Sequence, residues 1–193
     1  MIVRLARNYF AFLPLVPEIS SHGSRQSYGD LPPAAIKTIR DLIYYQYAKI
    51  IAQSAGLAHN FRFIMGRVTA LKKGEIQMSD ALREIKRQLK DEPRTCEFCG
   101  SDKGLSFDHI VPHSKGGPDS AENLVLACKH CNSSKSSKGL YEWYGLDRKD
   151  ELPRIVAGKY LKLLYEIHDH NGTLEEGDLR NDGELNVLDL EVY

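Results

Sequence analysis

Four cysteines, arranged as two Cys-x-x-Cys pairs, constrain this chain more than any other feature of its sequence. The first pair is Cys96 and Cys99 in CEFC, the second is Cys128 and Cys131 in CKHC, and the 193 residues include no other cysteine. Four thiolates are a common ligand set of tetrahedral structural zinc, and a two-residue gap lets both sulfurs of a pair reach one ion. The spacing therefore predicts a structural Zn²⁺ site that closes the 28-residue segment between the pairs.

A zinc ion with four thiolate ligands has no open position for catalysis, so any catalytic group must lie elsewhere. The enclosed segment contains candidates, because Asp108 and His109 stand side by side in SFDHIVPHSKGG. Two apolar stretches, LSFDHIV and ENLVLAC, flank a turn that contains Gly-Gly-Pro and predict β-strands. The polar stretch that begins at Lys129 predicts a helix. The segment is thus expected to place an acid and an imidazole at the end of a strand.

The stretch of residues 96 to about 138 resembles the HNH endonuclease family. The resemblance rests on Asp-His, Pro, Gly-Gly, Asn-Leu and Cys-x-x-Cys-Asn-x-x-Lys, which occur in that order. It implies a ββα-metal nuclease core in which His109 is the general base and Asp108 is a ligand of a catalytic divalent cation. It also implies that Asn123 supports the active-site loop through hydrogen bonds. Asn132 falls where many members carry histidine, and it still offers an oxygen ligand to a hard cation.

These residue types suit phosphodiester hydrolysis on chemical grounds as well. An imidazole is a suitable base for water near neutral pH, and a carboxylate with an amide oxygen would hold Mg²⁺ or Mn²⁺. Neighbouring residues of a strand point to opposite faces, so Asp108 and His109 can share one cleft only if the strand end twists. Backbone contacts to DNA are expected from three lysines: Lys115, Lys135 and Lys138.

Charge is distributed unevenly along the chain although the formal net charge is zero. Residues 1–95 carry 15 Lys and Arg against 8 Asp and Glu, whereas residues 164–193 carry 1 against 9. The basic part suits a polyanionic partner such as DNA, and the acidic end would avoid it or cover the basic surface. Ordinary solvated faces explain the same counts, so charge alone does not decide between the two interpretations.

The acidic end contains DLRNDGELNVLD, which resembles the calcium loop of dockerin and EF-hand proteins. Asp178, Asp182, Gly183 and Asp189 fall at positions one, five, six and twelve. Arg180, however, puts a cation where position three needs an oxygen ligand. The preferred interpretation is a solvated acidic tail without calcium.

Apolar residues at three- and four-residue steps predict helices on both sides of the zinc-closed segment. Helices are expected over residues 34–56, 61–74, 79–92, 140–146 and 152–170. The fold class is therefore expected to be α+β, with a ββα-metal core between helical flanks. The predicted regions are a mainly helical, basic part at 1–93, the nuclease core at 94–140, and a C-terminal helix with an acidic tail at 141–193.

The opening residues, MIVRLARNYFAFLPLVPEIS, imitate a secretory signal, but the apolar patch is short and contains two prolines. No apolar run is long enough to span a membrane, so a cytoplasmic location without a membrane partner is expected. The expected function is an HNH-type endonuclease that nicks or cuts DNA, and cutting both strands would favour a homodimer. The alternatives are a catalytically inactive, zinc-stabilised nucleic-acid-binding module and an HNH nuclease that acts on RNA.

Overall fold

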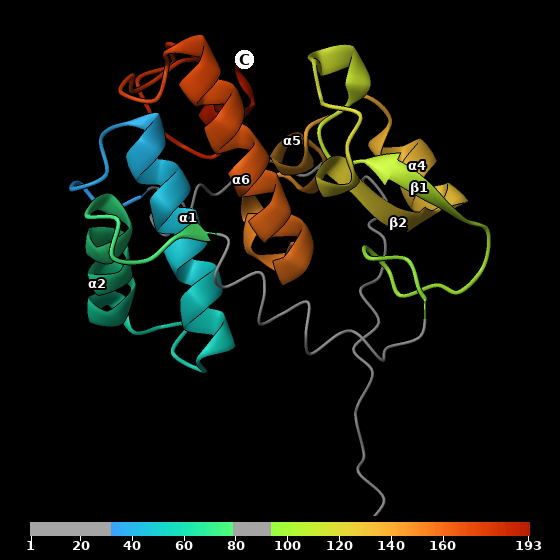
Figure 1. The fold of residues 1–193 in the computed structure, drawn as a ribbon, viewed down its shortest axis with the longest axis horizontal. Helices are drawn as coiled ribbons and strands as arrows, with labels where there is room; N and C mark the ends of the chain where they lie inside the picture. The colour runs from blue at the N-terminus through green and yellow to red at the C-terminus, as the bar shows by residue number, and fades with distance from the viewer. Residues whose placement is uncertain (1–31, 79–93) are drawn as a thin grey trace, which may run out of the picture.

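The computed structural model describes residues 32–78 and 94–193. Figure 1 shows helices α1 and α2 at one end, α6 in the middle, and β1, β2 and α4 at the opposite end. Helices and a two-stranded antiparallel sheet together confirm the predicted α+β class. The signal-like opening segment and the helix expected over 79–92 lie outside the described residues. The helices are α1 (Ile39–Ser54), α2 (Phe61–Lys72), α4 (Lys129–Lys135), α5 (Leu140–Tyr144) and α6 (Arg154–Asn171).

Helix α1 forms as its apolar periodicity predicts. It begins after Thr38, whose hydroxyl oxygen accepts a hydrogen bond from the backbone N–H of Asp41 at 3.2 Å, the contact of an N-cap. Ile39, Ile43 and Tyr47 follow at four-residue steps, and all three are fully buried. This face contributes to the apolar core, where α1 packs against α2 and α6.

The two strands form a hairpin that carries the Asp-His pair. Strand β1 (Leu105–His109) pairs with β2 (Leu124–Cys128), so that Asp108 lies opposite Val125. The first strand is shorter than the sequence predicts, because both backbone groups of Val111 bond to a side chain and not to a strand. Helix α4 follows β2 directly and completes a ββα unit.

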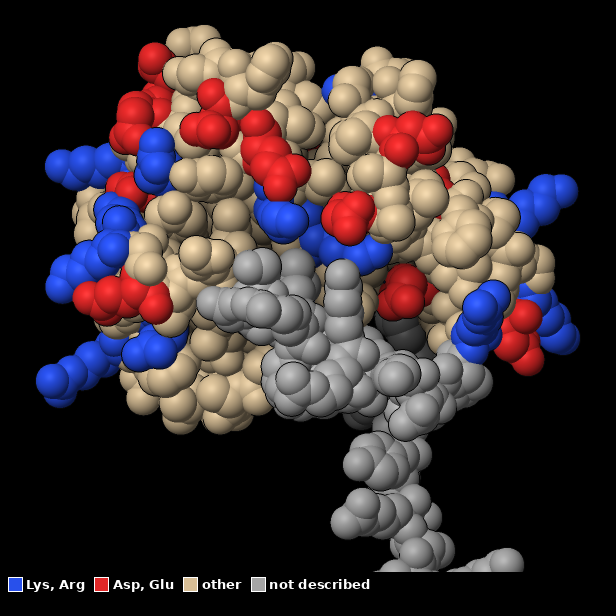
Figure 2. All heavy atoms as spheres, viewed as in Figure 1, with Lys and Arg blue, Asp and Glu red and all other residues tan. Residues whose placement is uncertain are grey.

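The C-terminal segment is packed against the helices, so the prediction of a solvated tail is wrong. Leu174, Val187 and Leu190 are buried, and the backbone N–H of Arg40 donates to the carbonyl of Leu174 at 2.9 Å. The segment packs because apolar residues recur between its acidic ones. Figure 2, which has the same view as Figure 1, shows acidic side chains on the upper part of the molecule, over α6 and the C-terminal segment. The remaining short 3₁₀ turns are η1 (His113–Lys115), η2 (Ala121–Asn123), η3 (Leu146–Glu151) and η4 (Asp189–Glu191).

Buried apolar residues from every part of the described chain join one hydrophobic cluster, which extends from Ile36 to Leu190 and includes three of the cysteines. The helices and the hairpin therefore share a core, and the three-part division of the sequence stays a prediction. Within the described ranges, no helix has both the length and the apolar character needed to cross a membrane.

Candidate functional site

The four cysteines converge at the base of the hairpin. Their sulfur atoms all lie within 4.8 Å of one another, and the thiols are free of disulfides. Cys99 Sγ lies 3.7 Å from Cys128 Sγ. Zinc–sulfur bonds of about 2.3 Å in a tetrahedron put neighbouring sulfurs about 3.8 Å apart. The cluster therefore has the dimensions that a tetrahedral metal ion such as zinc requires.

Local structure prepares these thiols for a metal. The backbone N–H of Cys131 lies 3.5 Å from Cys128 Sγ at the start of α4, and this contact lowers the pKa of the Cys128 thiol to about 7. Burial raises the pKa of Cys99 and Cys131. Metals bind thiolates, so of these three thiols Cys128 gives up its proton to a metal most readily.

An aromatic pair covers the first cysteine pair. Phe98 lies between Cys96 and Cys99 and is buried, and its ring meets that of Trp143 edge to face with 5.0 Å between centroids. The indole N–H of Trp143 donates to Ser134 Oγ at 3.0 Å, which joins α5 to α4. The environment of Trp143 therefore depends on the fold around the cysteine cluster.

Asn123 fastens the loop that follows β1. Its side chain is fully buried, its Oδ1 accepts from the backbone N–H of Val111 at 2.8 Å, and its Nδ2 donates to the carbonyl of Val111 at 2.9 Å. The same Nδ2 donates to the carbonyl of Pro118 at 2.9 Å. A Cβ at Gly117 would lie 2.0 Å from the Val111 carbonyl oxygen, so only glycine fits there. These contacts fix the path of residues 111–118.

Asp108 points from β1 towards α4, where it meets a buried lysine. Asp108 Oδ2 lies 3.2 Å from Lys135 Nζ, and the same ammonium group donates to the carbonyl oxygen of His109 at 2.7 Å. The Lys135 side chain is only 1% exposed. Lys135 was expected to contact the DNA backbone, but here it is buried and its charge is matched by that of Asp108.

His109 has a different set of neighbours from Asp108, as alternation along a strand requires. Its Nε2 lies 3.5 Å from Asp119 Oδ1, and its ring centroid is 6.2 Å from that of His113. Nε2 is buried and makes no hydrogen bond among the residues that the structure describes. No hydrogen bond or ion pair joins the Asp108 and His109 side chains among the described residues, and their convergence on one cleft stays a prediction.

The other expected site residues lie around the same unit. Asn132 lies on α4 three residues before Lys135, and residues at this spacing share one side of a helix. Lys115 follows His113 in η1 and pairs with Glu142 Oε2 at 3.3 Å. Lys138 is exposed beyond the end of α4. Of the three lysines expected to contact DNA, Lys138 is thus exposed and Lys115 is half-buried and paired.

The donor set at the end of the hairpin fits a hard divalent cation. Asp108 has a second carboxylate oxygen, Oδ1, besides the Oδ2 that faces Lys135, and Asn132 carries an amide oxygen on the adjacent helix. Oxygen donors of these two kinds suit Mg²⁺ and Mn²⁺, which bind through few protein ligands and keep several waters. Asp108 and Asn132 therefore carry the donor types that such a cation uses, and their joint ligation of one ion stays a prediction.

Two features of the site have no counterpart in the sequence motif. Asp119 is exposed, and only the folded loop brings it near His109. Phe107 is 68% exposed although it is aromatic, and alternation along β1 places it on the same face as His109. The signal for Phe107 was its place two residues before His109 in a predicted strand. No sequence pattern indicated that Asp119 lies near His109.

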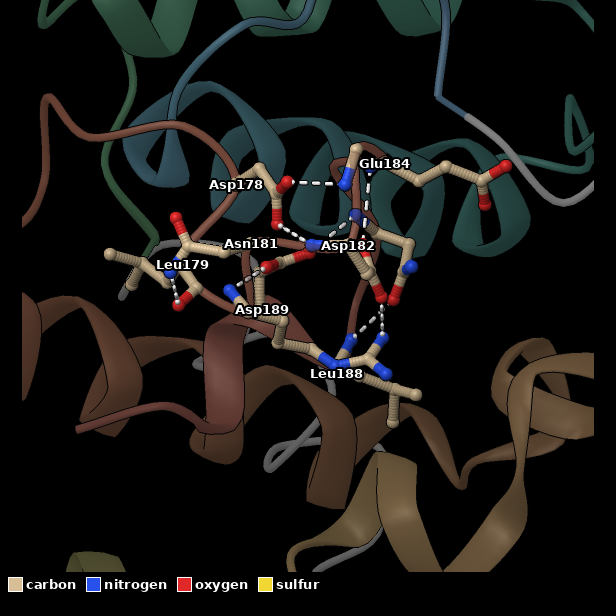
Figure 3. A network of polar contacts seen from close by, with 10 residues as sticks. Asp178, Leu179, Asn181, Asp182, Glu184, Leu188 and Asp189 are labelled. Atoms are coloured by element: carbon tan, nitrogen blue, oxygen red, sulfur yellow. Dashed lines mark hydrogen bonds and ion pairs between the residues drawn. The ribbon is translucent and has the colours of Figure 1, made fainter.

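The calcium-like loop of the C-terminal segment is closed by protein donors, as Figure 3 shows. Asp178 accepts from the backbone N–H groups of Asp182 and Gly183, the latter at 2.6 Å. Asp189 accepts from the N–H of Arg180 at 3.0 Å, and the Arg180 guanidinium pairs with Asp182 Oδ2 at 2.9 Å. The loop carboxylates thus have partners within the chain, and a guanidinium ion lies beside one of them.

Comparison with known proteins identifies the hairpin region. Residues 96–138 match the family model described as HNH endonuclease. The CRISPR-associated endonuclease Cas9 of Corynebacterium diphtheriae is 40% identical over 52 residues, which are 25% of this chain and 5% of that protein. The Cas9 endonuclease of Actinomyces naeslundii is 34% identical over 76 residues, which are 37% of this chain and 7% of that protein.

These similarities concern the hairpin region and a small part of each relative. The chain spans only 5% and 7% of the length of the two curated proteins. No solved structure matches the chain significantly. The matched residues nevertheless include the four converging cysteines, the Asp-His pair at the end of β1, and the asparagine that fastens the loop. Residues 96–138 therefore form an HNH endonuclease domain.

Proposed function

We propose that this chain is a metal-dependent endonuclease that hydrolyses phosphodiester bonds in DNA. The observation that carries the proposal is the position of Asp108 and His109 at the end of a short strand, within a region that matches the HNH endonuclease family. A structural zinc ion at the cysteine cluster would stabilise this small unit, whose own apolar core is limited.

In this proposal the side chains divide the chemistry between them. Oδ1 of Asp108 and the amide oxygen of Asn132 would hold Mg²⁺ or Mn²⁺. The bound cation would supply positive charge that stabilises the crowded phosphate and the leaving 3′ oxygen. His109 would take the proton of the attacking water, and Asn123 would keep the loop beside it in place.

The outer face of the hairpin would accept the nucleic acid. Phe107 exposes its ring on the same face of β1 as His109, and an exposed aromatic ring can stack on a nucleobase of any kind. Lys138 would contact a phosphate from the end of α4. Stacking and phosphate contacts do not depend on the base sequence of the nucleic acid. This surface would therefore give affinity for DNA without sequence specificity.

A plasmid assay separates the proposed nuclease from its rivals. Purified wild-type chain, loaded with zinc, is incubated with supercoiled plasmid and Mg²⁺ or Mn²⁺, and a structured RNA is tested in parallel. Conversion of the plasmid to the nicked or linear form supports a DNA endonuclease and also tells nicking from double-strand cleavage. Cleavage of the RNA alone would indicate an RNA nuclease. Binding of DNA without any cleavage would indicate the inactive binding module.

A further inference from the structure

Lys135 is a buried cation that the matched motif alone does not explain. Its side chain is 1% exposed. It is the last residue of the seven-residue helix α4, which also contains Cys131 and Asn132. Burying a lysine is costly unless an anion and hydrogen-bond acceptors surround the ammonium group. Lys135 has both, since Asp108 Oδ2 lies at 3.2 Å and the carbonyl oxygen of His109 accepts at 2.7 Å.

The position of Lys135 has a direct consequence for the carboxylate. Asp108 Oδ2 is buried and makes no directed hydrogen bond among the described residues, so the ion pair with Lys135 is what compensates its charge there. The same ammonium group holds the backbone carbonyl of His109, so one side chain fixes both the acid and the end of its strand.

We propose that Lys135 is a positioning residue for the catalytic cation: it holds Oδ2 of Asp108 and leaves only Oδ1 for Mg²⁺ or Mn²⁺. This inference rests on the proposed function. The ammonium group and the divalent cation share one carboxylate, so each weakens the hold of the other on it. Lys135 therefore keeps the metal-free protein folded and limits the affinity of the site for its cation, which keeps that cation exchangeable.

Manganese binding to the full, zinc-loaded chain tests the inference without any measurement of cleavage. Isothermal titration with Mn²⁺ is compared for wild type, K135M, K135R and D108N. Without the ammonium charge beside Asp108, K135M is expected to bind Mn²⁺ about tenfold more tightly, because a like charge a few ångströms away is removed. K135R keeps the charge and is expected to stay within about threefold of wild type, and D108N is expected to lose the binding.

Thermal unfolding gives the second readout. Metal-free K135M leaves a buried carboxylate unpaired, so its Tm is expected to fall below that of wild type, and Mn²⁺ is expected to raise it more than it raises the wild-type Tm. The double variant D108N/K135M removes both charges and is expected to recover much of the lost Tm. Should K135M fail to fold, K135Q replaces it, because its amide still donates to the His109 carbonyl.

The outcomes separate this inference from the proposed function. If K135M, or K135Q in its place, binds Mn²⁺ with the wild-type Kd or more weakly, Lys135 does not limit the site and the inference is overturned while the cation site stands. If the zinc-loaded wild-type chain binds no Mn²⁺, the proposed site for the catalytic cation is itself overturned. If Lys135 only supported the fold, K135M would loosen the site and bind Mn²⁺ more weakly, so tighter Mn²⁺ binding by K135M distinguishes the two roles.

Discussion

Asn123 and Val111 exchange two hydrogen bonds, with the side-chain Oδ1 accepting at 2.8 Å and the side-chain Nδ2 donating at 2.9 Å. One side chain thus replaces the strand partner that Val111 would otherwise need, and β1 ends at His109, two residues before Val111. The conformation of the loop beside His109, the proposed general base, depends on an amide twelve residues from Val111 in the sequence.

Replacing Asn123 should therefore damage both stability and activity. N123A leaves the buried N–H and C=O of Val111 without partners, and the loss is expected to cost about 3 kcal/mol and to lower the Tm by about 10 °C. N123D is the informative control, because it keeps the acceptor for the Val111 N–H but turns a carboxylate towards two carbonyl oxygens. Thermal unfolding followed by circular dichroism measures the Tm of both variants, and the plasmid assay measures their activity. Wild-type stability of N123A would contradict the role assigned to the amide.

Removal of the metal from the cysteine cluster should unfold the hairpin region. Trp143 is the single tryptophan of the chain and contacts Phe98 at the first cysteine pair, so its fluorescence reports on the cluster. A zinc chelator is expected to shift this emission and to lower the Tm by more than about 10 °C, because structural zinc contributes folding free energy directly.

Metal analysis completes that experiment. The protein purified without chelator is expected to contain about one zinc ion per chain, and C131S is expected to contain much less. A chelated protein with unchanged Trp143 emission and Tm would show that the cluster does not need a metal to fold.

His168 should make the protein less stable in mild acid. Its imidazole is fully buried, with Nε2 3.1 Å from the carbonyl oxygen of Leu190, and burial lowers its pKa below the usual value. Between that lowered pKa and about 6.5, the unfolded chain binds a proton at this histidine that the folded chain does not bind. The free energy of unfolding is therefore expected to fall as the pH drops from about 6.5 through the lowered pKa.

Urea unfolding at a series of pH values from neutral to mildly acidic tests this. H168Q can still donate to Leu190 and should lose part of the dependence on pH. H170Q changes an exposed histidine of the same helix and should keep the whole dependence. Equal slopes for H168Q and wild type would rule His168 out as the source.

Calcium should leave the wild-type protein unchanged. In the calcium-like loop, backbone donors already hold Asp178 and Asp189, and the Arg180 guanidinium pairs with Asp182. Millimolar Ca²⁺ is expected to change the Tm by less than about 1 °C, whereas R180N frees a carboxylate, adds an oxygen at position three and should gain a Ca²⁺-dependent rise. A calcium-dependent rise in the wild-type Tm would contradict this account of the loop.

Local patterns predicted the parts of the fold that local physics decides. The spacing of Ile39, Ile43 and Tyr47 predicted α1, because that spacing is a matter of short-range geometry. The same holds for the β-strands on either side of the glycines. The two Cys-x-x-Cys pairs predicted the cluster, because four thiolates form a common ligand set for one metal ion. The motif also predicted Asn123 as a support of the loop, and its hydrogen bonds to Val111 and Pro118 are of that kind.

The remaining features depend on contacts that no local pattern contains. Lys135 reads as a solvent-facing lysine of a polar helix, and only the packing of α4 against β1 turns it towards an acid 27 residues earlier. The acidic C-terminal segment reads as solvated, but Leu190 is buried and Glu191 accepts from the backbone N–H of Tyr141 at 2.7 Å. Composition gives the charge of a segment but not the surface on which it packs.

We propose His109 as the base of a metal-dependent nuclease, and cleavage of supercoiled plasmid by paired histidine variants is the experiment that tests this role. Rates are measured for wild type, H109A and H59A with Mg²⁺ or Mn²⁺, after zinc content and Tm are shown to match; His59 is exposed and lies before α2, outside the HNH domain. H109A is expected to lose at least about 100-fold in rate, because it lacks the proton acceptor, while H59A is expected to cleave like wild type. Cleavage by H109A at the wild-type rate would show that His109 is not the base.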